Sequence, residues 1–208
     1  GLGIPAEPLF RSDSVYLKDV DLALMLHPSG KTSVTNESLA VDPLDFHFYG
    51  KAAHASGSPD KGINALDAVI QLFNGINALR QHVPSDVRIH GIITHGGDAP
   101  NIVPEYVAAR FYIRAPSWPK TEEISQKVRK IAEGAALATG ATVKIERFQN
   151  EVKDLVVNEV VDETLAQKLN GLGENVHPRG NRSPGSTDAG NISYEVPAAH
   201  GYIKIGPD

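Results

Sequence analysis

The 208-residue chain contains no cysteine. This absence excludes disulfide bonds, thiolate metal sites and a cysteine nucleophile, so a bound metal would have to be held by His, Asp or Glu side chains. A chain without cysteine also fits a reducing compartment, and we therefore expect a cytoplasmic protein.

Long apolar runs and an excess of positive charge are also absent. No stretch approaches the roughly 18 apolar residues of a membrane-spanning helix, so we expect no membrane partner. Acidic residues number 25 and basic residues 20, which gives a net charge of −5, the wrong sign for gripping phosphate backbones. Six Phe, six Tyr and one Trp are few for a sheet that stacks on bases. We therefore expect no nucleic-acid partner.

The hydrophobic content of 41% is sufficient for a real core, and its periodicity predicts both strands and helices. Apolar residues alternate in the predicted strand at 44–50, with Leu44, Phe46 and Phe48 on one face, and recur at steps of three and four in the predicted helices at 62–81 and 121–140. Thr121, followed by two glutamates, predicts the start of the second helix, and Gly140 predicts its end. The predicted strands are residues 20–27, 44–50, 87–95, 107–115, 142–148 and 202–205, and the predicted helices are residues 62–81, 121–140 and 160–172.

Residues 44–148 therefore read strand, helix, strand, strand, helix, strand, which is the ferredoxin-like, split βαβ order. We predict an α/β (α+β) fold in which a ferredoxin-like βαββαβ domain covers residues 43–150 and is flanked by residues 1–42 and 151–208. The apolar stretch at 202–205 needs strand partners outside that domain. Because the chain opens Gly1-Leu2-Gly3 without Met, we expect it to come from the interior of a longer one.

Several strings at ordered spacing resemble the M20 family of metallopeptidases and amidohydrolases. Three lie in the predicted ferredoxin-like domain, and three more lie on its flanks. They are GKAAHAS at 50–56, GINALDA at 62–68, GGDAPNIVP at 96–104, GIPAE at 3–7, ALMLHP at 23–28 and GSTD at 185–188. The likeness covers nearly the whole chain and is strongest to the branch that includes aminobenzoyl-glutamate hydrolase and dipeptidases acting on small amides.

The resemblance implies how these parts are organised. In the family, a two-part metal-binding catalytic domain is interrupted by a ferredoxin-like lid that often carries the dimer contact. Residues 43–150 would then be the lid, and residues 1–42 and 151–208 would be fragments of the catalytic domain. A homodimer is expected, since pairing across a two-fold axis would cover an edge strand of the lid.

The implied activity is metal-dependent hydrolysis of an amide bond in N-acyl amino acids or small dipeptides. Glu7 would be the general base that deprotonates the attacking water, and His27 would be a ligand of zinc or manganese. His54, in the lid, would steady the developing oxyanion and could reach the active site of a partner subunit. Each residue also has a structural alternative. Glu7 could be a surface acid, His27 an ordinary turn histidine, and His54 a polar residue at a helix entry.

Four further residues would bind substrate if the resemblance holds. Asn101 would hold a substrate carbonyl, and Arg114 would hold a carboxylate through its planar guanidinium. Gly185 and Ser186 would offer backbone N–H groups to an anionic end, because glycine permits close approach. An ordinary structural hydrogen bond or surface ion pair is the alternative for Asn101 and Arg114, and Asp188 could equally cap a helix.

The chain also departs from the family pattern. Pro8 stands where the family has a second acid, and Glu7 and His27 alone are too few ligands for a catalytic zinc. We therefore expect this chain by itself to bind catalytic metal poorly or not at all, and a non-catalytic dimerisation or regulatory module is the second hypothesis. The other six histidines fit no ligand spacing and are predicted to be structural or surface residues: His47, His82, His90, His95, His177 and His200.

Overall fold

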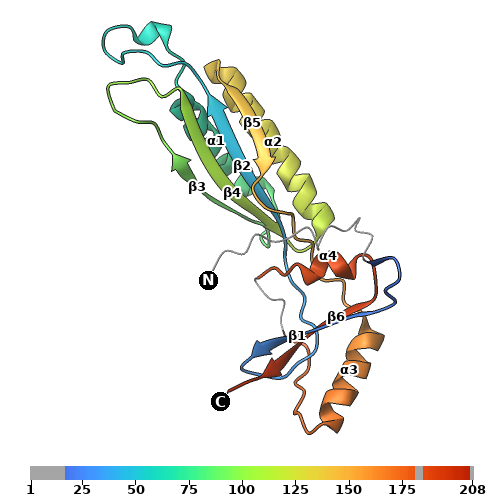
Figure 1. Ribbon diagram of the computed structural model, residues 1–208. Coiled ribbons are helices and arrows are strands. Elements are labelled where there is room, and N and C mark those ends of the chain that lie inside the picture. Colours follow the sequence, from blue (N-terminus) through green and yellow to red (C-terminus); the bar gives the residue numbers. More distant parts are fainter. Residues whose placement is uncertain (1–16, 181–184, 207–208) are drawn as a thin grey trace. The chain divides into compact units, whose positions relative to one another are not determined.

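The computed structural model describes residues 17–180 and 185–206 (Figure 1). The chain divides into two compact units. The first, here called the central unit, is Val41–Glu151. The second, here called the flanking unit, combines the described residues up to Ala40 with those from Val152 onward. Within the described residues, no helix is long and apolar enough to cross a membrane.

The central unit contains a four-stranded sheet and two long helices in the expected order. Its strands are hydrogen-bonded in the order β3-β4-β2-β5, with β5 antiparallel to β2 and β3 antiparallel to β4. The elements are β2 (Ala40–Tyr49), η3 (Pro59–Lys61), α1 (Ala65–Leu79), η4 (Arg80–His82), β3 (Arg88–His95), β4 (Tyr106–Ala115), α2 (Trp118–Thr139) and β5 (Thr142–Arg147).

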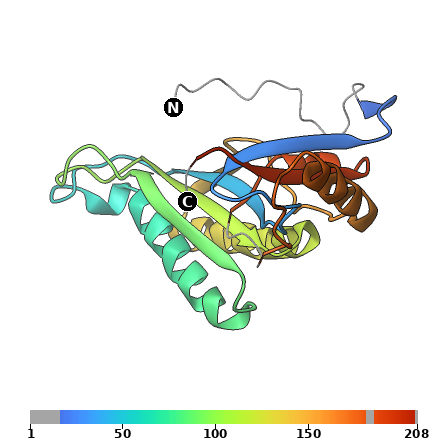
Figure 2. The same cartoon turned by 90° about the horizontal axis from the view of Figure 1, so that it is seen from below.

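One continuous apolar core joins these elements. Both helices lie on the same face of the sheet (Figure 2), and alternate residues of the central strands point toward them. The ring of Phe111 packs against Phe46, with centroids 5.9 Å apart, and against Phe73, with centroids 4.8 Å apart. The largest fully buried side chains are Phe46, Phe48, Phe111, Leu44, Leu72, Ile76, Ile113, Ile124, Val69, Val107 and Val128. The alternation predicted for residues 44–48 is thereby confirmed.

Both long helices begin within three residues of their predicted starts, α1 later and α2 earlier. The side chain of Asn64 caps α1, accepting from the backbone N–H groups of Leu66 at 2.9 Å and Asp67 at 3.3 Å. The predicted start of the second helix at Thr121 is wrong, because α2 already begins at Trp118. Its first turn contains a proline, which needs no N–H partner there. The hydroxyl of Thr121 instead donates to the carbonyl of Ser117, one turn earlier.

The flanking unit is built on a parallel pair of strands. Strand β1 (Ala23–Ser29) pairs with β6 (Ala198–Lys204), and the helices are α3 (Glu159–Gly171) and α4 (Ala189–Ser193). Strand β1 leaves Leu24 59% exposed and Leu26 44% exposed, although parallel strands are usually covered on both faces.

A buried polar network connects these elements of the flanking unit. The carboxylate of Asp162 is 2% exposed and accepts from the hydroxyl of Thr35 at 2.6 Å and from Arg179 at 3.0 Å. The Thr35 oxygen in turn accepts from the backbone N–H of His200 at 2.9 Å. Specific hydrogen bonds therefore link β6, α3 and the segment that follows β1.

Candidate functional site

The predicted site residues lie in different parts of the chain. Glu7 lies outside the described residues. His54 and Asn101 lie together in two paired loops of the central unit, whereas Arg114 lies elsewhere in that unit. His27, Gly185 and Ser186 belong to the flanking unit.

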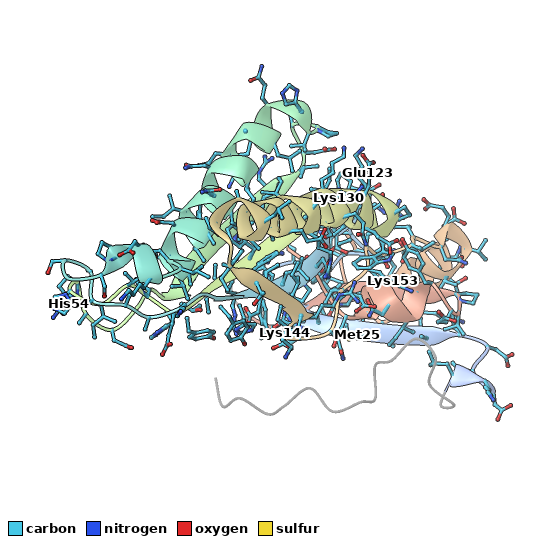
Figure 3. All side chains as sticks on the ribbon, turned by 90° about the horizontal axis from the view of Figure 1, so that it is seen from above. Met25, His54, Glu123, Lys130, Lys144 and Lys153 are labelled. Carbon is cyan, nitrogen blue, oxygen red and sulfur yellow. The ribbon has the colours of Figure 1, made fainter. Side chains whose placement is uncertain are left out.

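Two loops bring His54 and Asn101 together. The backbone N–H of Ala55 donates to the carbonyl of Asn101 at 3.0 Å, and the N–H of Val103 donates to the carbonyl of Ala53 at 2.9 Å. His54 lies far out on the unit, in the loop ahead of α1 (Figure 3). The two motif strings at 50–56 and 96–104 are therefore one structural feature.

Gly50 permits the first of these loops to fold back on itself. The backbone N–H of Lys51 donates to the carbonyl of Ile63, and the N–H of Ile63 donates to the carbonyl of Lys51, both at 2.9 Å. A Cβ atom at Gly50 would lie only 2.1 Å from the Ile63 carbonyl oxygen. Glycine is required here because the two backbones approach too closely for any side chain.

The local backbone fixes the tautomer of His54. Its Nδ1 atom accepts from the backbone N–H of Gly57 at 3.0 Å and lies 3.3 Å from that of Ser56. Because a backbone N–H can only donate, Nδ1 carries no proton, and the neutral ring carries its proton on Nε2. The exposed imidazole therefore presents an Nε2–H donor, which is what stabilising an oxyanion requires.

Arg114 lies at the other end of β4 from these loops. The carbonyl of Glu105, beside the start of β4, accepts from Gly50, which belongs to the His54 loop. The eight residue steps of extended strand from Tyr106 to Arg114 span roughly 27 Å. Arg114 and the loop pair of one copy therefore cannot contact the same small substrate.

The neighbours of Arg114 hold its guanidinium in place. Its Nε donates to Nε2 of His90 at 3.3 Å, and its guanidinium carbon lies 5.2 Å from the ring centre of Tyr112. Burial, followed by the positive charges of Arg114 and Arg80, lowers the pKa of His90. A neutral His90 accepts the Arg114 hydrogen bond without charge repulsion.

Gly185 and Ser186 precede α4 in the flanking unit. The Gly185 carbonyl accepts from the backbone N–H of Leu39 at 2.9 Å, so this contact uses its carbonyl and not its N–H. Asp188 occupies the N-cap position of α4, yet its side chain makes no capping hydrogen bond. Asp188 instead lines a pocket of about 210 Å³ together with His200.

His27 lies within β1, two residues before its end, and its ring is exposed. The Nδ1 atom is 2.8 Å from the carbonyl oxygen of Pro28. Because a carbonyl oxygen only accepts, Nδ1 carries the proton and Nε2 is left with a free lone pair. Metal-ligating histidines commonly have this arrangement, in which one nitrogen is held by a carbonyl and the other faces the ion.

Sequence reasoning missed His200 as a candidate. Its ring is edge-on to that of His27, with centroids 6.1 Å apart, on neighbouring strands. The residue is 3% exposed, and neither ring nitrogen has a hydrogen-bond partner among the described residues. Burial, followed by the charge of His27, lowers its pKa, while Asp188 opposes the shift. A buried polar atom without a partner costs about 1–3 kcal/mol, so this ring calls for an explanation.

These donors fit only part of a metal site. A catalytic zinc usually takes three protein ligands, and the described residues contain no group of three or more His, Asp or Glu side chains that could hold a metal. The two imidazoles of His27 and His200 are suitable nitrogen donors, and nitrogen favours zinc over manganese.

Comparison with known proteins identifies the wider family. Residues 44–140 match the M20 peptidase dimerisation domain. The chain is 34% identical to the Xaa-Arg dipeptidase of Mus musculus over 215 residues, which cover 100% of this chain and 50% of that protein. It is 38% identical to one of the p-aminobenzoyl-glutamate hydrolase subunits of Escherichia coli (strain K12) over 157 residues, which cover 74% of this chain and 32% of that protein.

A solved structure agrees with these sequence relatives. The aminobenzoyl-glutamate utilization protein from Klebsiella pneumoniae superimposes with a TM-score of 0.77 at 21% identity, covering 91% of this chain and 51% of that one. At that identity the likeness supports the mixed α/β fold alone. The chain spans about half the length of the dipeptidase that it matches over its whole length. The chain belongs to the M20 family of peptidases and amidohydrolases, and its residues 44–140 correspond to the peptidase dimerisation domain of that family.

Proposed function

We propose that this chain takes part in metal-dependent hydrolysis of an amide bond in small dipeptides or N-acyl amino acids, supplying a lid and part of the active site. The observation that carries the proposal is the arrangement of His54. The backbone N–H groups that follow it hold its Nδ1 as an acceptor, so its exposed Nε2–H can donate to a carbonyl oxygen that gains negative charge.

The other site residues take roles consistent with their surroundings. Asn101, whose backbone is paired with the His54 loop, holds a substrate carbonyl with its side-chain amide. Arg114 binds the carboxylate of the substrate, since a guanidinium can pair with both carboxylate oxygens. Gly185 and Ser186 lie against an anionic end of the substrate, and Glu7 is the general base.

We also propose zinc as the metal, with manganese as the alternative, and His27 as one of its ligands. A divalent ion bound there would supply a Lewis acid for the amide carbonyl. Two relatives suggest the class of substrate, because one is an Xaa-Arg dipeptidase and another is an aminobenzoyl-glutamate hydrolase subunit. Both names describe an amide bond to an amino acid with a charged side chain.

The central unit is the lid in this proposal, and its element and strand orders support classing it as ferredoxin-like. We further propose that it forms a homodimer. His54 and Arg114 lie near opposite ends of β4, so one active site would take His54 from one copy and Arg114 from the other. Edge strands β3 and β5 are available for pairing across a two-fold axis.

The test is a hydrolysis assay on purified protein loaded with Zn²⁺ or Mn²⁺. The substrates are dipeptides ending in arginine, p-aminobenzoyl-glutamate and N-acetyl amino acids, and mass spectrometry measures the released amino acid. We expect hydrolysis of at least one class, and we expect His54→Ala to lower kcat by about 10²–10³-fold, as loss of one oxyanion donor does. His82→Ala, which changes another exposed histidine of the same unit, is the matched control.

A second function is a dimerisation or regulatory module without chemistry of its own. The observation in its favour is that the described residues contain no three-ligand metal cluster. The same protein preparation distinguishes the two functions when its mass is measured by sedimentation. A dimer that hydrolyses none of the substrates with either metal would support the module and contradict the enzyme.

A further inference from the structure

We propose that His200 is a second metal-binding imidazole, and that it binds one first-row transition-metal ion together with His27. This inference rests on the proposed function, since it adds a ligand to the same site. It assigns a role to a histidine that the sequence pattern predicts to be a structural or surface residue.

The side chain of His200 is buried. It is 3% exposed, and both ring nitrogens lack a hydrogen-bond partner among the described residues. Its backbone, in contrast, is well held, because its N–H donates to Thr35. The structure therefore fixes the position of the residue while leaving its two ring nitrogens unused, which is the condition of a ligand before its ion is bound.

The rings of His27 and His200 lie at a distance that fits one shared ion. A zinc–nitrogen bond of about 2.0–2.1 Å places two imidazoles that share one ion with their ring centroids roughly 5–6.5 Å apart. The centroids of His27 and His200 are 6.1 Å apart, and the rings stand at 84° to each other. The rings are therefore not stacked face to face, and their separation lies within the range that one shared ion requires.

The strand register explains why the two rings meet. In the parallel pair, Met25 lies opposite His200 and His27 lies opposite Tyr202. Residues two apart on a strand point to the same face. Both histidines therefore project from one face of the β1–β6 pair, and backbone hydrogen bonds fix their spacing, as a preorganised site requires.

The hydrogen bonding of His27 determines which of its ring nitrogens can bind an ion. The contact of His27 Nδ1 with the Pro28 carbonyl puts the proton on that nitrogen, so Nε2 is the metal-binding atom. Two neutral nitrogens make an incomplete site, and they are matched to zinc, cobalt, nickel or copper ions more than to manganese.

The test uses Co²⁺ alone as the probe, added to metal-free protein and followed by calorimetry and by the visible absorption of the bound ion. We expect about one ion per chain, and we expect His27→Ala and His200→Ala each to weaken binding by at least about tenfold. His177→Ala is the control, because that histidine is exposed elsewhere in the same unit.

Cysteine substitution shows directly whether the side chain at position 200 touches the ion. Because the chain has no cysteine, a thiolate-to-cobalt absorption band in His200→Cys can only come from the new side chain. The preceding residue on β6 points to the opposite face of the strand pair, so Ala199→Cys should give no band. In case His200→Cys does not fold, His27→Cys is compared with and without His200→Ala, and the second change should weaken its band.

A ligand role for His200 is decided by these Co²⁺ measurements. A band in His200→Cys with none in Ala199→Cys supports it, as does tenfold weaker binding by His200→Ala. Unchanged Co²⁺ affinity in His200→Ala, or no Co²⁺ binding by the unaltered protein, overturns it. If only His27→Ala loses the ion, His200 is not a ligand. The proposal of metal-dependent hydrolysis is unaffected by that result, because the separate assay of substrate turnover tests it.

Discussion

The central and flanking units are stabilised by different interactions. The large apolar core cluster of the described residues lies wholly within the central unit, where two helices cover one face of a four-stranded sheet. In the flanking unit, several of the buried residues are polar, among them Thr35, Asp162 and His200. Burial of apolar area thus stabilises the proposed lid, whereas directed hydrogen bonds position the elements that carry His27 and His200.

The largest expected effect is loss of stability in the central unit on Phe111→Ala. The side chain is 1% exposed and contacts two other phenylalanines, so its removal leaves a cavity and should lower the free energy of unfolding by about 3–5 kcal/mol. Chemical denaturation followed by fluorescence measures it, because the single tryptophan, Trp118, lies in this unit.

The control for that experiment is Ile92→Ala, which changes an apolar side chain that is 63% exposed. It should change the unfolding free energy by less than about 0.5 kcal/mol. If both substitutions had the same effect, the apolar core would not be what stabilises the central unit.

The next largest effect is expected in the flanking unit on Thr35→Val. This change keeps the shape of the side chain, but it leaves Asp162 and the N–H of His200 each without one buried partner. The cost should be about 1–3 kcal/mol. Hydrogen exchange read by mass spectrometry should show faster exchange in α3 and β6, with the Trp118 transition unchanged.

Thr164→Val serves as the control, because that hydroxyl is exposed on α3 and bonds only within its own helix turn. Faster exchange in the central unit, or none in β6, after Thr35→Val would contradict the contrast between an apolar unit and a hydrogen-bonded one.

The smallest effect concerns surface charge on the central unit. Lys120 and Lys127 hydrogen-bond to Glu123 and lower its pKa to about 2. A carboxyl whose pKa is depressed on folding stabilises the protein above its unfolded pKa, and that contribution is lost as the pH falls from about 4.5 toward about 2. Glu123→Gln should therefore make stability less dependent on pH in this window.

Denaturation followed by Trp118 fluorescence at pH 6 and at pH 3.5 would measure the change, with Glu133→Gln, another exposed acid of α2, as the control. The difference should be far smaller than for Phe111→Ala, because solvent screens an exposed pair. An equal pH dependence in the unaltered protein and in Glu123→Gln would show that these ion pairs do not contribute to stability.

Hydrophobic periodicity predicted the elements of the central unit well, because buried side chains recur along each of them at the period of a strand or a helix. The alternation at residues 44–48 and the helical stripe ending near Leu79 depend on which face of each element is buried, and neighbours along the chain reveal that face. The Thr121 prediction is wrong because it weighs capping propensity above the preference for proline in a first helical turn, which Pro119 satisfies.

The flanking unit was harder to predict for a physical reason. His200 and His27 are far apart in sequence and meet only through the parallel register of β1 and β6, so no local spacing marks them.

In the central unit, the pairing of the His54 loop with Asn101 depends in the same way on backbone hydrogen bonds between distant segments. The resemblance to the family named both residues, but the protonation state of His54 required the positions of the Gly57 and Ser56 N–H groups.

The most direct test of the central claim is complementation between His54→Ala and Arg114→Ala in mixed dimers. If one active site takes these residues from two copies, each variant alone should be nearly inactive, and each mixed dimer should contain one intact site. An equal mixture that exchanges protomers should regain about a quarter of the unaltered hydrolytic activity. No recovery, with mixed dimers demonstrated by mass spectrometry, would contradict a shared active site.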